Sequence, residues 1–163
     1  MDFFAAARAC LDAADPADKV ARTREFAAAH AAGSLPICAD APPPEPIRAP
    51  GRPDKPALVA PRDTPQRGLG STEGRAAFLH AIAHIEFNAI NLALDAAYRF
   101  RGMPEAFYSD WASVADDEAR HFSLLTTRLA ELGFAYGDFS AHNGLWDMAE
   151  KTAGACLARI VTP

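Results

Sequence analysis

The segment STEGRAAFLHAIAHIEFNAINLALDAAYRF, residues 71–100, restricts the fold more than any other part of the chain. It contains no proline, and its only glycine, Gly74, falls in what would be the first turn of a helix. Ser71 or Thr72 can cap the beginning of this helix, and Gly102 can end it in a left-handed conformation. The pattern therefore predicts one unusually long helix.

A second long helix is predicted from Pro104 to Gly133, because apolar residues recur there at spacings of three and four. The segment FAYGDFSAHNG is typical of a loop, and a third helix is predicted from Leu145 to Ile160. Since only a short turn at Gly102 separates the first two helices, we expect an antiparallel hairpin at the centre of an all-α fold.

The composition changes along the chain and predicts three regions. Residues 1–32 are rich in alanine and predict two short helices that break at Asp15–Pro16. Nine of the thirteen prolines lie between Pro42 and Pro65. Because each proline removes a backbone donor, residues 33–70 are expected to form an extended arm. Residues 71–163 would then form the helical domain.

Charge and composition restrict the classes of partner. The net charge of −5 argues against nucleic-acid binding through a broad basic surface. No run approaches the roughly 18–20 apolar residues of a membrane span, and the N-terminus lacks the basic start of a secretory signal. The three cysteines are scattered without a CxxC pair, which favours reduced thiols. We expect a cytoplasmic protein without a membrane partner.

Glu86 stands in the apolar stripe of the first long helix. A helical wheel at about 100° per residue places apolar residues on its side: Leu79, Ile82, Ala89, Ile90, Ala93, Ala97 and Phe100. The opposite side is expected to be the polar face of the helix: His80, His84, Asn88, Asn91, Asp95 and Arg99. A carboxylate therefore occupies an apolar position although a polar face was available.

The second long helix has the same irregularity. Its apolar seam consists of Phe107, Trp111, Val114, Leu125, Leu129 and Leu132. Glu118 and His121 fill two positions of that seam. Glu86 lies 16 residues before Gly102 and Glu118 lies 16 residues after it. At ~1.5 Å per residue both are about 24 Å from the turn, so an antiparallel hairpin brings the two carboxylates to one level.

Two carboxylates and an imidazole in apolar positions are costly in free energy unless a partner stabilises them. An unpaired buried carboxylate costs several kcal/mol or takes up a proton, whereas a metal ion is stabilised by carboxylate and neutral imidazole. We therefore predict metal ligands at Glu86, Glu118 and His121. A buried polar network with a protonated glutamate, or a seam partly open to water, would also explain these residues.

Other polar residues have simpler explanations. His80 and His84 have the spacing of zinc ligands but lack an evident third ligand, so a polar packing or solvated face is favoured. His142 is expected to bond to the backbone of its loop. Asp117 could orient the ring of His121 or lie on the surface.

At these residues the sequence resembles a ferritin-like bacterial family, domain of unknown function 455. The resemblance covers PGRPDKPALVAPRDTPQRGLGSTEGRAAFLHAIAHIEFNAINLALDAAYRF and PEAFYSDWASVADDEARHFSLLTTRLAELGFAYGDFSAHNGLWDMAEKTA. It implies a four-helix bundle with a di-iron site, in which Glu86 is a lone glutamate and Glu118-x-x-His121 the motif of the next helix. More distantly, the pattern is similar to tRNA-hydroxylase and rubrerythrin-type proteins.

The resemblance also shows what this chain lacks. A ferritin-like bundle needs a second glutamate and a second Glu-x-x-His on two further helices, and Glu150 is expected on the surface instead. We therefore expect a bundle that is incomplete at its C-terminal end, with three explanations left open: the chain is shortened, a homodimer completes the bundle, or the scaffold has lost its metal. The functions implied are an iron or manganese oxidoreductase or hydroxylase, a non-catalytic iron-binding protein, or a metal-free helical scaffold.

Overall fold

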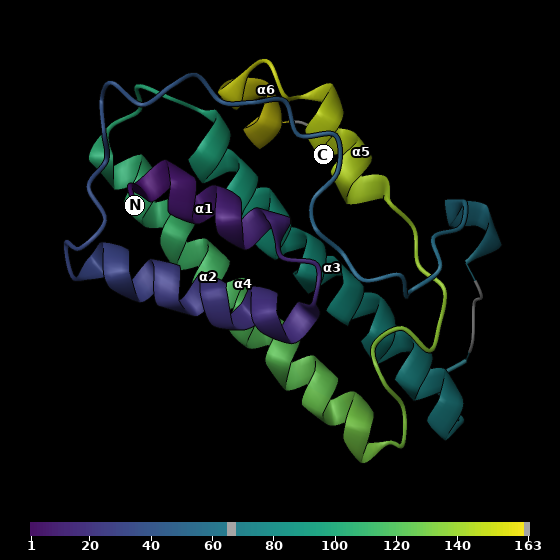
Figure 1. The fold of residues 1–163 in the computed structure, drawn as a ribbon. Helices are drawn as coiled ribbons and strands as arrows, with labels where there is room; N and C mark the ends of the chain where they lie inside the picture. Colours follow the sequence, from purple (N-terminus) through teal and green to yellow (C-terminus); the bar gives the residue numbers. More distant parts are fainter. Residues whose placement is uncertain (65–67, 162–163) are drawn as a thin grey trace.

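The computed structural model describes residues 1–64 and 68–161 and confirms the all-α class (Figure 1). Its elements are α1 (Phe3–Asp12), α2 (Pro16–Ala31), a 3₁₀ turn η1 (Pro61–Asp63), α3 (Thr72–Arg99), α4 (Glu105–Glu131), α5 (Gly144–Lys151) and α6 (Cys156–Val161). Within these residues the only β pairing is an isolated bridge between Leu58 and Ala141.

The hairpin α3–α4 forms the centre of the molecule, as predicted. The Ser71 hydroxyl caps α3 by accepting a hydrogen bond from the Gly74 backbone at 3.0 Å. Gly102, in the turn between the helices, has φ +71°, a conformation that favours glycine. The two helices run side by side in opposite directions (Figure 1), so residues at equal distances from the turn meet.

Helices α1 and α2 cover one side of this hairpin (Figure 1). Asp15 caps α2 and Pro16 begins it, as the sequence predicts. The Lys19 ammonium of α2 is fully buried and donates to the backbone oxygens of Cys10 and Leu11 at the end of α1. Burial lowers the pKa of Lys19 to about 7. This lysine therefore ties the two short helices together.

The polar side of α3 is largely buried, so polar packing, one of the two explanations favoured for His80 and His84, is correct and a solvated face is not. Tyr136 donates to Nδ1 of His84 at 2.9 Å, and Nε2 of His84 donates to the His142 carbonyl at 3.0 Å. The Gly137 backbone donates to Nε2 of His80 at 2.9 Å. Four polar residues of this side are buried: His80, Asn88, Asn91 and Asp95. The loop after α4 and Arg159 of α6 supply partners that a helical wheel does not reveal.

The predicted third helix is wrong in one respect, because it is broken into α5 and α6. The Thr152 hydroxyl bonds back to the Met148 carbonyl at 2.9 Å where α5 ends. Arg159 of α6 then turns inward and reaches Asp95 of α3 at 2.8 Å. A buried ion pair therefore holds α6 against α3, and the chain must turn sharply between the two short helices.

Helix α3 is more apolar than expected, because no segment of the sequence was predicted to be long and apolar enough to span a membrane. By length and composition alone it could cross a membrane, although a core helix of a soluble protein passes the same criterion. In this structure 44% of its most apolar window is buried against other parts of the chain.

Candidate metal centre

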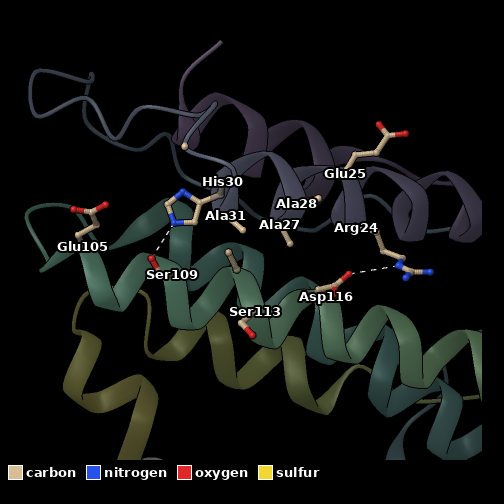
Figure 2. A pocket seen from close by; sticks show the side chains of 12 residues that line it. Arg24, Glu25, Ala27, Ala28, His30, Ala31, Glu105, Ser109, Ser113 and Asp116 are labelled. Atoms are coloured by element: carbon tan, nitrogen blue, oxygen red, sulfur yellow. Dashed lines mark hydrogen bonds and ion pairs between the residues drawn. The ribbon is translucent and has the colours of Figure 1, made fainter.

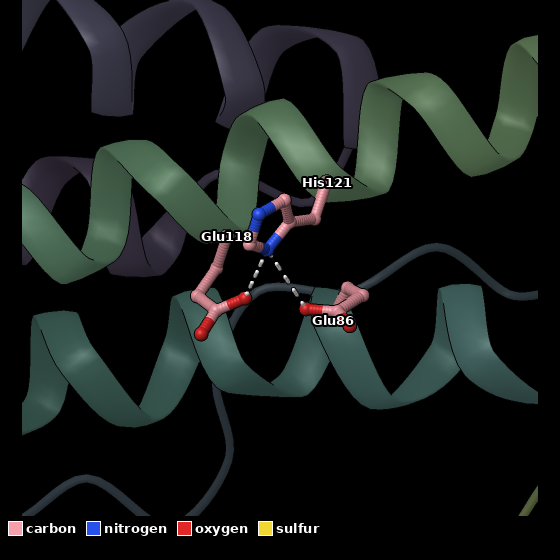
Figure 3. A group of neighbouring side chains, drawn as sticks. All are labelled: Glu86, Glu118 and His121. Atoms are coloured by element: carbon pink, nitrogen blue, oxygen red, sulfur yellow. Dashed lines mark hydrogen bonds and ion pairs between the residues drawn. The ribbon is translucent and has the colours of Figure 1, made fainter.

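The structure brings Glu86, Glu118 and His121 together across the hairpin (Figure 3). Nδ1 of His121 lies 3.0 Å from Oε2 of Glu118 and 3.7 Å from Oε2 of Glu86. One candidate ligand atom from each residue lies within 4.8 Å of the other two. Figure 3 shows Glu118 and His121 pointing from α4 toward Glu86 on α3. The level match expected from the distances to Gly102 is thus realised.

The cluster lies at the margin of the core, which corrects the expectation that it would be enclosed. The side chains of Glu86, Glu118 and His121 remain 20%, 23% and 43% exposed. The reason is that α1 and α2 pack against a neighbouring stripe, where Phe87 and Phe122 are buried. The alternative of a seam partly open to solvent therefore describes the position of these residues.

The two carboxylates perturb each other. The pKa of Glu86 is raised to about 7, first by the hydrogen bond it shares with Glu118, then by burial and by the charge of Glu118. His121 acts in the opposite direction. Near neutral pH a proton on Glu86 would therefore compete with a bound cation.

The spacing of the three donors suits a metal ion. Carboxylate oxygens and imidazole nitrogens bind transition metals at about 2.0–2.2 Å. Two ligands at such a distance, separated by angles of about 90–120°, lie roughly 3.0–3.7 Å apart. The distances from Nδ1 of His121 to the two glutamates, 3.0 and 3.7 Å, fall in this range. The third separation, between one oxygen of Glu86 and one of Glu118, is at most 4.8 Å.

The comparison with known proteins identifies the family. Residues 12–162 match a family described as "Protein of unknown function (DUF455)". This chain belongs to the DUF455 family. The DUF455 chain is 58% identical over 108 residues to an "Uncharacterized protein" of Haemophilus influenzae, a match that covers 62% of this chain and 38% of the relative. It thus spans well under half the length of that relative. No solved structure matches it.

The remaining histidine candidates in this DUF455 protein serve as packing groups. Both ring nitrogens of His84 are used, and burial lowers its pKa. Burial also lowers the pKa of His80 to about 4, and this ring stacks on Tyr136. His142 accepts from the Gly144 backbone at 3.2 Å, as predicted for a loop residue. These histidines lock the loop after α4 onto α3.

Arg120 is a neighbour of the cluster that sequence reasoning missed. Its Nη2 lies 3.2 Å from Nε2 of His121 and 3.3 Å from Oδ1 of Asp117. Asp117 therefore contacts the arginine, and not the imidazole ring. Arg120 donates to Nε2 of His121, which leaves Nδ1–H of this ring to donate to Glu118. Nδ1 must therefore lose this proton before it can bind a metal. Consecutive residues of a helix point in different directions, so the wheel offered no signal for this contact.

A large groove of the DUF455 chain lies elsewhere, between α2 and α4 (Figure 2). It has a volume of about 830 Å³ and is lined mostly by small or polar side chains. His30 bonds to Ser109 at 3.0 Å and Arg24 pairs with Asp116 at 3.5 Å across it. Size alone would favour this groove as a ligand site. The chemistry favours the Glu86 cluster, because among the residues that the structure describes only these two carboxylates and this imidazole converge.

Proposed function

We propose that this protein binds a divalent transition metal, iron or manganese, through Glu86, Glu118 and His121. The observation that carries the proposal is the convergence of three donors from two helices, within 4.8 Å of one another. Glu118 also raises the pKa of Glu86 to about 7, as expected for two carboxylates at one site. A set of two carboxylates and one imidazole suits iron and manganese. The +2 charge of one divalent ion balances the negative charges of the two ionised glutamates.

The more specific proposal is a di-iron carboxylate protein with oxidoreductase or hydroxylase activity. It is supported by the resemblance to ferritin-like proteins and by the position of the Glu118-x-x-His121 motif beside a lone glutamate on the adjacent helix. Bound iron would supply one-electron redox chemistry and coordination positions open to an oxidant. The chain itself would orient the ligands from the paired helices α3 and α4. The alternative is a protein that binds iron without turning over a substrate, since the same ligands serve an iron enzyme and an iron-binding protein.

Metal analysis of the purified protein tests this function. After anaerobic supply of iron(II), or supply of manganese(II), we expect about one ion per three-residue cluster to remain bound through desalting. Protein that retains neither ion would contradict the proposal. Air is then admitted to the iron form. Oxygen consumption that continues with a reductant and forms an oxidised product favours the enzyme, whereas a single round without product favours the iron-binding protein.

Metal affinity should depend on pH. The raised pKa of Glu86, about 7, means that this carboxyl is mostly protonated below pH 7 and ionised above it. A proton and a metal compete for the same oxygen, so affinity should fall as pH falls. Between pH 8 and pH 6 this group alone should lower it about tenfold. Calorimetry in buffers of different ionisation enthalpy should show close to one proton released per ion near pH 6. Equal metal affinities at pH 8 and pH 6 would contradict the raised pKa of Glu86.

A further inference from the structure

An uncovered apolar surface surrounds the metal cluster. Five residues on the same half of their helices as the cluster form this surface, named here the open face: Phe78, Ile82, Ile85, Val114 and Leu125. Phe78 and Ile85 remain 52% and 50% exposed, and Val114 remains 38% exposed. Exposed apolar groups gathered around polar ligands are typical of a surface that meets a partner.

The ligand set is incomplete on the same side. Glu86, Glu118 and His121 offer three donors, whereas iron and manganese in carboxylate and imidazole sites bind more than three. The three side chains are 20–43% exposed, so the remaining coordination positions face outward. Any protein group that completes the site must therefore arrive across the open face.

We propose that a second copy of this chain docks on the open face, around a two-fold axis, and that the docking requires metal. This inference rests on the metal site proposed above. A two-fold interface uses the same patch on both copies. It would bring a second Glu86, Glu118 and His121 to the first set, so that carboxylates of each copy complete the coordination of the other's ion. The pair would hold two ions.

The charges explain why metal controls the association. Without metal, docking would bring two pairs of carboxylates together in a site that loses water, and like charges oppose this. One divalent ion on each copy cancels that charge. The open face contains only a few half-exposed apolar side chains, too few by themselves to offset the entropy lost on association. Metal and partner should therefore bind cooperatively, each strengthening the other.

Light scattering after gel filtration tests this inference on the 163-residue chain. The metal-free protein should have the monomer mass of 17.4 kDa, and protein with manganese(II) should have twice that mass. A chelator should restore the monomer. A monomer that binds manganese, or a dimer that persists with chelator, would overturn the inference while leaving the metal site intact. Absence of manganese binding would overturn the proposed function as well.

Two matched variants locate the interface. Phe78→Glu places a charge on the open face about 12 Å along α3 from Glu86, so it leaves the ligands unchanged. Leu157→Glu makes the same change on α6, where the side chain is 73% exposed. We expect Phe78→Glu to weaken the manganese-dependent dimer at least about tenfold while the monomer still binds manganese, because the charge would lose water in the interface. Leu157→Glu should behave as the wild type. Equal effects of the two variants would overturn the assignment to this face.

Discussion

Replacing Glu118 by alanine is expected to lower the affinity for manganese(II) or iron(II) by at least about 100-fold, because even groups that only support a metal ligand contribute 10–100-fold. Glu118 supplies an oxygen 3.0 Å from Nδ1 of His121 and shares a hydrogen bond with Glu86. Its loss removes one donor and leaves a single carboxylate to balance the charge of the ion. Isothermal titration of the folded variant measures the effect.

The control is Glu131→Ala. Glu131 lies on the same helix, 13 residues after Glu118, or about 20 Å along the helix axis. Glu131 is exposed and pairs with Arg128, so this variant also removes one carboxylate from α4. Its metal affinity should stay within about twofold of the wild type, since exposed charges at this distance are screened by salt. If both variants lose affinity equally, the ions bind through general acidity and not through the cluster.

Removing the carboxylate of Asp95 should destabilise the fold by about 3–5 kcal/mol. Asp95 is fully buried and bonds to Arg99 and Arg159, and the side chain of Arg159 is itself only 4% exposed. In Asp95→Ala, Arg159 keeps only neutral partners, the Thr152 hydroxyl and the Ala149 carbonyl. A buried charge without an opposite charge is the costly state. Urea unfolding of the metal-free protein, followed by circular dichroism, measures the loss.

The exposed pair Arg128–Glu131 again supplies the comparison. Breaking it in Glu131→Ala should cost at most about 1 kcal/mol, because surface ion pairs contribute little. The double variant Asp95→Leu, Arg159→Met should be more stable than Asp95→Ala alone, since both charges are then gone. A double variant as unstable as the sum of its single variants would show that the two side chains are not coupled.

The sequence was sufficient to predict the hairpin and the meeting of its polar groups. A helix rises by a constant amount per residue, so the equal separations of Glu86 and Glu118 from Gly102 determine their common level. The caps at Ser71 and Asp15 were also predictable, because capping depends on residues close in the sequence. These features follow from local geometry.

Features that depend on distant segments were not predictable in the same way. The wheel separated the two sides of α3 correctly but did not show that the side with His80 and Asp95 would be buried. Its partners are the loop around Tyr136 and the distant Arg159, which no periodicity connects to α3. The opposite error affected Glu86. Ile90, Ala93 and Ala97 of its stripe are buried, but Glu86 itself lies at the margin of the core because α1 and α2 cover the neighbouring stripe.

Anomalous diffraction from crystals grown with manganese(II) tests the central claim most directly. The account predicts a manganese peak between α3 and α4, about 2.0–2.3 Å from a carboxylate oxygen of Glu86, a carboxylate oxygen of Glu118 and a ring nitrogen of His121. A fully occupied manganese position elsewhere on the chain, with no peak at these three side chains, would contradict it.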